Sequence, residues 1–333
     1  MTVNVVSESQ YAPNFFRGMH TAFMSHIKLL RKNNIRVKIN SFGKADITHI
    51  HSLGPFALYK MLTSKHIVVS THTIPDTMIG TFRGSRYWGR LFKKYLKFFY
   101  NKADLIILFS PYMAEELKKI GINKKMAIIA NPIDTSFFVP DPHLKKLVRK
   151  KFNIKEDAVV ILGAGHVVKR KGIIDFVAVA KTMPEYEFFW VGGKSAGIIR
   201  AGVKKSYLKK NLSANMHFLG SFSYKEMHEL YNMADILFFP SYQETQGLVI
   251  VEAAACGLPL ILRDLPEYRS LYDNSYYSCR TNNEFVKAIK GLAMDKENYN
   301  EARKTSLSLA KKFSMETLGK KLLFYYTELL QVK

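Results

Sequence analysis

The stretch FFPSYQETQGLVIVEAAACGLP, from Phe238 to Pro259, decides the fold of this 333-residue chain. An apolar run typical of a strand, Asp235 to Phe239, leads into it. A polar turn that carries Glu244 follows, and a helix-forming run begins near Gly247 and ends at Gly257. A strand, a loop and a helix therefore follow one another, as in the repeating unit of an α/β fold.

The start of the predicted helix is a candidate anion site. Its first backbone N–H groups lie beside Thr245, Gln246 and Gly247, and they lack partners within the helix. A phosphate could bind there, at the positive end of the helix dipole. Glu252 stands in an otherwise apolar segment of the same helix, where a carboxylate needs a partner. One carboxylate in the loop and one in the helix predict two hydroxyl-rich ligand groups.

These residues resemble a known family. Glu244 and Glu252, Gly247 and the trailing Ala-x-Gly-x-Pro of 255–259 are similar to the E-x7-E segment of retaining, nucleotide-sugar-dependent glycosyltransferases of family 4. The resemblance implies the two-domain GT-B fold. It also implies that the first Glu holds sugar hydroxyls, the helix start holds the diphosphate, and the second Glu holds the ribose. The alternative is a buried Glu252 that a neighbouring lysine satisfies.

Two series of alternating strand and helix patterns predict two doubly wound, Rossmann-like domains. We expect the boundary near residue 140, with an acceptor- and membrane-binding domain over 1–140 and a nucleotide-sugar-binding domain over 141–314. An amphipathic segment over 315–333 is expected to return to the first domain, as the terminal helix of GT-B proteins does. The expected strands are Val3–Ser7, Val37–Asn40, Ile47–Ser52, Ile67–His72, Leu105–Ser110, Ala127–Asn131, Val159–Gly165, Glu187–Gly192, Met216–Gly220, Asp235–Phe239, Pro259–Arg263 and Tyr276–Cys279.

The composition is that of a globular protein with an unusual charge. Hydrophobic residues make up 47% and charged residues 23%, and two cysteines indicate no disulfide framework. No apolar run has the length of a membrane span, and the N-terminus lacks the pattern of a signal peptide. The net charge of +23 favours an extended anionic partner, a membrane surface or nucleic acid, although Lys-rich usage throughout a proteome would look similar.

The first domain offers two candidate site residues. Ser9 to His20 matches the family's glycine loop over the donor phosphates, with Gly18 as the close-approach glycine; the alternative is a simple helix-entry turn. His72 follows an apolar strand and resembles the family's Thr-x-His element near the reacting sugar, the alternative being a structural histidine. A further histidine segment, Thr48-His-Ile-His51, is the weaker candidate.

The second domain carries the expected diphosphate clamp. Gly163 to Gly172 occupies the place of the family's Gly-Arg…Lys-Gly segment, with Gly165 in the loop and Lys171 matching the family's lysine. His166 stands where the family has Arg, and an imidazole cannot reproduce a guanidinium fork. Arg170 or Lys169 could supply the lost charge, or both could belong to a solvated turn.

The segment Arg83 to Lys102 is the most basic part of the chain and contains no acidic residue. If it is helical from about Ser85, one face is aromatic and another is basic. A basic amphipathic helix of this kind is typical of a membrane interface, and the alternative is a core-packed helix with a solvated outer face. The expected membrane-binding residues are Arg83, Arg86, Trp88, Arg90, Phe92, Lys93, Lys94, Tyr95, Lys97 and Phe99.

The combined pattern resembles bacterial diglucosyldiacylglycerol synthases. The resemblance implies a peripheral enzyme on the cytoplasmic face of the membrane that moves an α-hexosyl unit, glucose in first place, from a UDP-sugar to a glycolipid. Its catalytic residues would be His72, Lys171 and Glu244. Asp-x-Asp is absent, so we expect no metal in the reaction. No recognised nucleic-acid motif occurs, so we expect no nucleic-acid partner. The alternatives are a soluble enzyme of polysaccharide synthesis, or a non-catalytic basic protein that binds membrane or nucleic acid.

Overall fold

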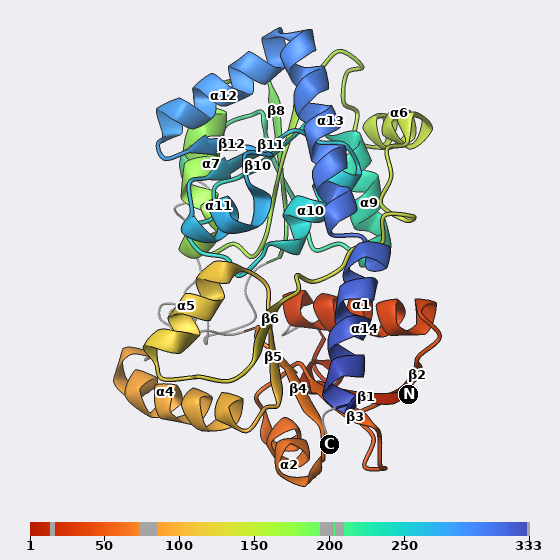
Figure 1. Cartoon of the computed structure of the whole chain (residues 1–333). Helices are drawn as coiled ribbons and strands as arrows, with labels where there is room; N and C mark the ends of the chain where they lie inside the picture. The colour runs from red at the N-terminus through yellow and green to blue at the C-terminus, as the bar shows by residue number, and fades with distance from the viewer. Residues whose placement is uncertain (14–16, 73–84, 194–202, 204–209, 332–333) are drawn as a thin grey trace. The chain divides into compact units, whose positions relative to one another are not determined.

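The computed structural model describes residues 1–13, 17–72, 85–193, 203 and 210–331, with the backbone alone for 17 and 85–88. The described chain divides into two compact units (Figure 1). Unit 1 combines residues 1–72, 85–134 and 313–331, and unit 2 consists of described residues between 135 and 312. Each unit contains one six-stranded sheet.

The sheet of unit 1 is parallel, with strand order β2-β1-β3-β4-β5-β6. In its centre, Val5 pairs with Ile39 on one side and with His49 on the other. The order reverses between β1 and β3, and ligands bind at such points in open α/β sheets. The strands are β1 (Thr2–Val6), β2 (Arg36–Ile39), β3 (Ile47–Ile50), β4 (Ile67–Ser70), β5 (Leu105–Leu108) and β6 (Met126–Ile128).

Helices cover both faces of this sheet (Figure 1). Three of them, α2, α4 and α5, share one buried apolar cluster with alternate residues of the strands, such as Ile50 and Val69. The helices α1 and α14 lie against each other on the opposite face. The bounds are η1 (Glu8–Gln10), α1 (Arg17–Lys32), α2 (Pro55–Thr63), α4 (Ser85–Asn101), α5 (Pro111–Lys119) and α14 (Met315–Gln331).

The sheet of unit 2 is also parallel, with strand order β12-β11-β10-β7-β8-β9. This is the Rossmann order, and it reverses between β7 and β10. Phe238 stacks on Phe176 in the buried core, with the ring centroids 5.2 Å apart. The strands are β7 (Val160–Ala164), β8 (Glu187–Val191), β9 (Met216–Gly220), β10 (Ile236–Phe239), β11 (Leu260–Arg263) and β12 (Tyr277–Cys279).

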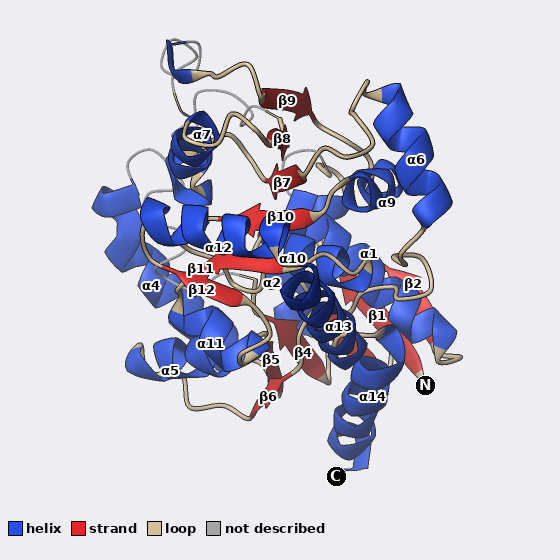
Figure 2. Cartoon of the chain, turned by 90° about the horizontal axis from the view of Figure 1, so that it is seen from above, coloured by secondary structure: helices blue, strands red, loops and turns tan. Residues whose placement is uncertain are grey.

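The helices of unit 2 form a layer on each face of its sheet (Figure 2). One layer contains α7 and α12, whose apolar residues enter the main core cluster. The other contains α9, α10 and α13, which pack on one another. The bounds are α6 (Pro142–Lys151), η2 (Lys169–Lys171), α7 (Ile173–Lys181), α9 (Tyr224–Met233), α10 (Leu248–Ala255), α11 (Pro266–Tyr272), α12 (Asn282–Met294) and α13 (Lys296–Lys312).

The structure confirms the predicted fold class and all of the predicted strands. The terminal helix α14 is part of unit 1, where its residues Leu322 and Tyr326 are buried. The chain passes between units after Asp134 and after Lys312, a few residues before the expected limits near 140 and 314. The next helix, α6, begins at Pro142, where Asp141 caps it by accepting from the Leu144 N–H.

Candidate active site

The candidate donor site lies at the carboxyl ends of β7 and β10, where the strand order of unit 2 reverses. Two loops meet there. One runs from Gly165 to Gly172 after β7, and the other runs from Pro240 to Gly247 after β10. The fold therefore brings together the two loops that carry the predicted donor-site residues, although they lie far apart along the chain.

Glycines allow these loops to approach each other closely. Gly172 has a φ of +74°, and a Cβ there would lie 2.1 Å from the Pro240 carbonyl oxygen. Gly192 follows β8 with a φ of +135°, and a Cβ there would lie 1.9 Å from the Gly165 carbonyl oxygen. Any side chain would push the backbones apart, so these positions require glycine.

Lys171 and Glu244 form an ion pair across the two loops. The Ser241 hydroxyl also donates to the Glu244 carboxylate, at 2.7 Å. Burial raises the pKa of Glu244, but the Lys171 ammonium and the Arg170 charge outweigh burial and hold the pKa below its usual value. Glu244 is therefore a carboxylate, which can accept hydrogen bonds from sugar hydroxyls.

Arg170 is hydrogen-bonded to the second loop, residues 240–247. Its guanidinium donates to the Gln243 carbonyl oxygen at 2.6 Å, and its own carbonyl oxygen accepts from the Tyr242 N–H at 2.8 Å. It is thus not simply part of a solvated turn. The neighbouring His166 lies half-buried in the first loop, and Lys169 is exposed.

The first turn of α10 leads away from this loop. Gly247 caps the helix with a φ of +80°, and Thr245 is half-buried beside it. Gln246 is buried, and its carbonyl oxygen accepts from the Tyr272 hydroxyl, which anchors the loop to α11. Glu267, also on α11, accepts from the Glu244 N–H at 3.2 Å. Two hydrogen bonds with residues of α11 therefore fix the position of the loop that leads into α10.

Glu252 is buried in α10, and its partner is a tyrosine, not a lysine as in the alternative interpretation. The Tyr231 hydroxyl donates to the Glu252 carboxylate at 2.7 Å. Burial raises the pKa of Glu252 to about 7, and the hydrogen bond from Tyr231 lowers it less than burial raises it. Glu252 can therefore change its charge near neutral pH.

The two candidates of unit 1 lie at different places in its fold. Gly18 is in the first turn of α1, exposed and with open space around it, so the preceding loop ends before Arg17. His72 follows β4, and its Nε2 lies 3.1 Å from His51 Nδ1. Burial lowers the pKa of His72 to about 3, so the imidazole is neutral.

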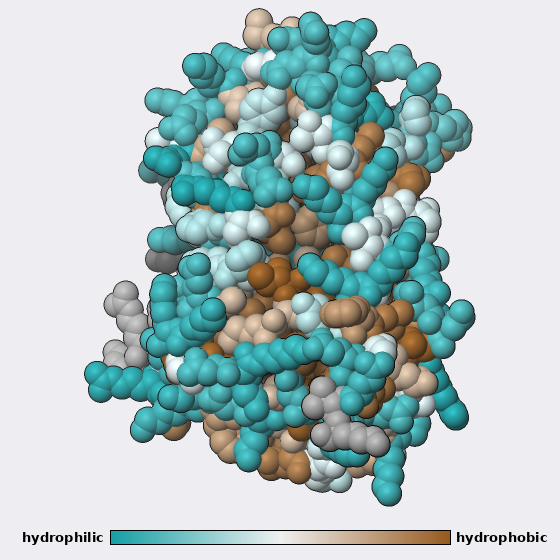
Figure 3. All heavy atoms as spheres, viewed as in Figure 1, coloured by the Kyte–Doolittle hydropathy of each residue, from teal (hydrophilic) through white to brown (hydrophobic). Residues whose placement is uncertain are grey.

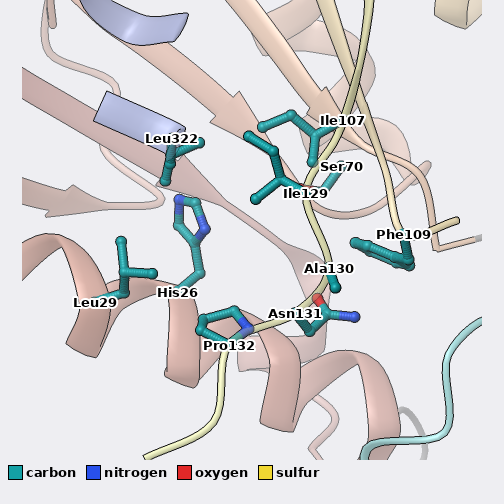
Figure 4. Close-up of a pocket in the computed structure, with 10 residues that line it drawn as sticks. All are labelled: His26, Leu29, Ser70, Ile107, Phe109, Ile129, Ala130, Asn131, Pro132 and Leu322. Carbon is teal, nitrogen blue, oxygen red and sulfur yellow. The ribbon is translucent and has the colours of Figure 1, made fainter. Parts of the chain in front are cut away.

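A buried histidine cluster lies around this strand end. The sequence indicated His49 and His51 as a weaker candidate, but not that His26 joins them. His26 from α1, His49 from β3 and His51 just after it have ring nitrogens within 4.8 Å of one another. The His-x-His spacing on a strand was the available signal, because residues two apart face the same side. A cavity of about 10 Å³ adjoins His26 and Ser70 (Figure 4).

The helix α4 forms as predicted, but its aromatic face packs against the core. Phe99 is fully buried, and Phe92 and Tyr95 pack against the same cluster. The assignment of Phe99 to the membrane is therefore wrong, because the α2–α4–α5 layer must bury an apolar face against its sheet. Arg83 lies outside the described residues, as do the side chains of Arg86 and Trp88.

Other residues form the outer surface of α4. Leu91 is 71% exposed and Phe98 is 47% exposed, one above the other at a spacing of two helical turns. Four basic side chains of the same helix are also exposed, and Figure 3 shows that hydrophilic side chains cover much of this face of the molecule. These are Arg90, Lys93, Lys94 and Lys97.

Comparisons with known proteins identify the family. Residues 3–137 match the sequence family described as Glycosyltransferase Family 4, and residues 145–307 match the one described as Glycosyl transferases group 1. Together the two matches span nearly the whole chain. The protein belongs to the glycosyltransferases with the GT-B fold.

Two relatives resemble the chain over most of its length. An alpha-galactosylglucosyldiacylglycerol synthase of Streptococcus pneumoniae is 28% identical, over 96% of this chain and 87% of the relative. A processive diacylglycerol alpha-glucosyltransferase of Acholeplasma laidlawii is also 28% identical, over 95% of each chain. Both names describe enzymes of glycolipid synthesis.

Two solved structures share the fold. Anabaena HepE in complex with UDP and glucose has a TM-score of 0.78 at 15% identity and covers 98% of this chain and 99% of its own. Sucrose-phosphate synthase from Thermosynechococcus elongatus has a TM-score of 0.79 at 15% identity and covers both chains fully. None of the helices in the described residues has the length and apolar content needed to cross a membrane.

Proposed function

We propose that this hexosyltransferase moves an α-glucosyl unit from UDP-glucose to a membrane glycolipid such as monoglucosyldiacylglycerol, with retention of configuration. The observation that carries the proposal is the Lys171–Glu244 pair at the β7/β10 switch point, with Glu252 in the following helix. The names of the two relatives support a diacylglycerol-based acceptor. The complexes of HepE with UDP and with UDP-glucose support the donor.

In the proposed donor site, each residue binds a different part of the nucleotide sugar. Glu244 orients the hexose through its hydroxyls, and Glu252 accepts from the ribose hydroxyls. The Lys171 ammonium and the N–H groups near Thr245 to Gly247 face the diphosphate. The diphosphate gains negative charge as the sugar bond breaks, so donors held in place there stabilise the transition state more than the ground state.

The proposed transfer occurs on one face of the sugar. We assign no covalent nucleophile, and the leaving phosphate helps to take the proton from the acceptor hydroxyl. His72 contributes as a neutral hydrogen-bonding group next to the hexose. Its Nε2 is engaged with His51, which leaves Nδ1 for a sugar or acceptor hydroxyl. The reaction as proposed uses no metal.

The proposed acceptor side rests on α4. Leu91 and Phe98 can enter the interface of a bilayer, while Arg90, Lys93, Lys94 and Lys97 contact anionic headgroups. Each basic residue contributes on the order of 1 kcal/mol near an anionic leaflet. The enzyme would attach peripherally to the cytoplasmic face, where nucleotide sugars are made.

Transfer from labelled donors to mixed lipid acceptors tests the function. We expect label from UDP-glucose in a diglucosyl lipid whose new anomeric centre is α by NMR, with less label from UDP-galactose. Transfer to water-soluble oligosaccharides alone would favour the soluble polysaccharide enzyme instead. If no donor is either hydrolysed or used for transfer, the result would favour a non-catalytic binding protein.

A further inference from the structure

The buried histidines of unit 1 converge on one point. His49 and His51 project from the same face of the sheet, and His26 reaches them from α1. The ring centroid of His26 lies 4.3 Å from that of His49 and 4.7 Å from that of His51. All three side chains are buried.

A fourth group joins them from the terminal helix. The Tyr326 hydroxyl contacts both His26 Nε2, at 3.2 Å, and His49 Nδ1. Tyr326 is fully buried. Three imidazole nitrogens and one phenol oxygen therefore lie around one small space, contributed by α1, by β3 with the residue after it, and by α14.

One nitrogen of the cluster is left unexplained by hydrogen bonding. His51 Nε2 is buried and has no hydrogen-bond partner among the described residues. Buried polar atoms nearly always have a partner, and an exception indicates a missing ligand, ion or water. His51 also contributes one ring nitrogen to the group of three that lie within 4.8 Å of one another.

The outer hydrogen bonds set the histidine tautomers. His49 Nε2 lies 2.8 Å from the Ser70 hydroxyl, and His51 Nδ1 lies 3.1 Å from His72 Nε2. If these outer nitrogens carry the protons, the lone pairs of His49 Nδ1 and His51 Nε2 are directed into the shared space. Metal-ligating histidines typically have this arrangement, in which the second ring nitrogen donates to a neighbouring group.

We propose that His26, His49 and His51, with the Tyr326 hydroxyl, bind a divalent transition-metal ion of the zinc type. Imidazole and oxygen ligands in a tetrahedral set suit zinc. Bond lengths of about 2.0–2.1 Å to zinc require ligand atoms roughly 3.4 Å apart. The rings therefore move inward by about 1 Å or less each on binding, which small side-chain rotations provide.

The ion would have a structural role. It would link α1, β3 and α14 inside unit 1. It shares no residue with the donor site of unit 2, and it touches the proposed function only through the contact of His51 with His72. Among the described residues no carboxylate belongs to the group, so Tyr326 would release its proton to solvent and offset one of the two positive charges. The cavity beside His26 and Ser70 has room for about one water-sized particle (Figure 4).

Metal content of the full-length protein tests the proposal. The chain is purified with an affinity tag that contains no histidine, stripped with chelator, and incubated with zinc or cobalt chloride. We expect about one equivalent of zinc per chain by mass spectrometry of the metal, and the intense visible bands of tetrahedral cobalt. We also expect the melting temperature to rise by roughly 3–6 °C with zinc.

Variants separate this site from adventitious binding by other histidines. His51→Gln and Tyr326→Phe should each lose the cobalt bands and most of the bound zinc. His66→Gln, which alters a histidine of unit 1 outside the cluster, should retain both. A wild-type chain that stays metal-free after incubation overturns the proposal without any variant. Equal metal binding by wild type, His51→Gln and Tyr326→Phe overturns it too.

Discussion

At the scale of single residues, Lys171 is the most direct test of the donor site. Lys171→Ala should lower the transfer rate by roughly 10²–10³, as the loss of one well-placed transition-state donor does elsewhere. Lys169→Ala is the matched control, because Lys169 is exposed in the same short turn. The measurement is kcat with UDP-glucose, with circular dichroism to verify the fold. Near-normal turnover in a folded Lys171→Ala protein removes this residue from the mechanism.

His166 occupies the position of the family's arginine, and Arg170 could supply its charge, so the two residues should differ in their effect on donor binding. Arg170→Ala should weaken donor binding more than His166→Ala, because Arg170 both holds the Gln243 carbonyl and adds positive charge beside Glu244. Titration calorimetry with UDP gives the two affinities. If the His166→Ala variant binds UDP more weakly than the Arg170→Ala variant, Arg170 has not taken over the role of the family's arginine.

Glu252 should make stability depend on pH. Its pKa is raised from 4.5 to about 7, so folding favours the protonated form. The stabilisation is complete below about pH 4.5 and is lost as the pH rises through 7, a change of about 3 kcal/mol. Glu252→Gln should remove this dependence.

The test compares denaturant unfolding of wild type and Glu252→Gln between pH 4.5 and 8. Every other titrating group is shared by the two proteins, so the difference between their curves isolates Glu252. Curves that run parallel across this range would show that Glu252 is ionised in the folded protein throughout.

At the scale of elements, the helix α4 could be predicted from the sequence, but the face that it buries could not. The periodicity of its sequence predicts the helix and an aromatic face along it, and the structure contains both. The sequence cannot show which stripe is buried, because Phe92 and Phe99 resemble Leu91 and Phe98 in composition. Packing against α2 and α5 decides it. The donor loops were easier to predict, because their glycines and charges follow strands whose ends must meet.

The exposed surface of α4 should determine lipid binding. Exchanging Arg90, Lys93, Lys94 and Lys97 for Gln should weaken binding to anionic vesicles and flatten its salt dependence, since four charges contribute about 4 kcal/mol before screening. Phe98→Ser should weaken binding with little change in salt dependence. Co-sedimentation with phosphatidylglycerol vesicles measures both effects.

A matched control for this exchange lies in unit 2. Lys287, Lys290, Lys296 and Lys304 are exposed on α12 and α13, and their exchange for Gln changes the net charge equally. This control should bind vesicles as the parent does. If the two sets of exchanges weaken binding alike, total charge rather than α4 governs attachment.

At the scale of the whole molecule, the two units differ in how the chain builds them. Unit 2 is continuous from 135 to 312, whereas unit 1 needs the distant segment 313–331. The amphipathic pattern of 315–331 predicts the helix, whereas its return to the first domain is expected only from the resemblance to GT-B proteins. The sequence did not reveal that Tyr326 would meet His26 and His49, since such contacts depend on where helices cross.

The continuity of unit 2 predicts an independently folding fragment. Residues 135–312 alone should unfold cooperatively and bind UDP through Lys171. Residues 1–134 alone should not fold, because they lack the buried side chains of Leu318, Leu322 and Tyr326. Those three contribute roughly 5–9 kcal/mol by burial, comparable with the total of about 5–15 kcal/mol that stabilises a typical domain. Adding a peptide of residues 313–333 to the fragment 1–134 should restore helical content and protease resistance. A fragment 1–134 that folds without the peptide would show that α14 only covers a sheet that is already stable.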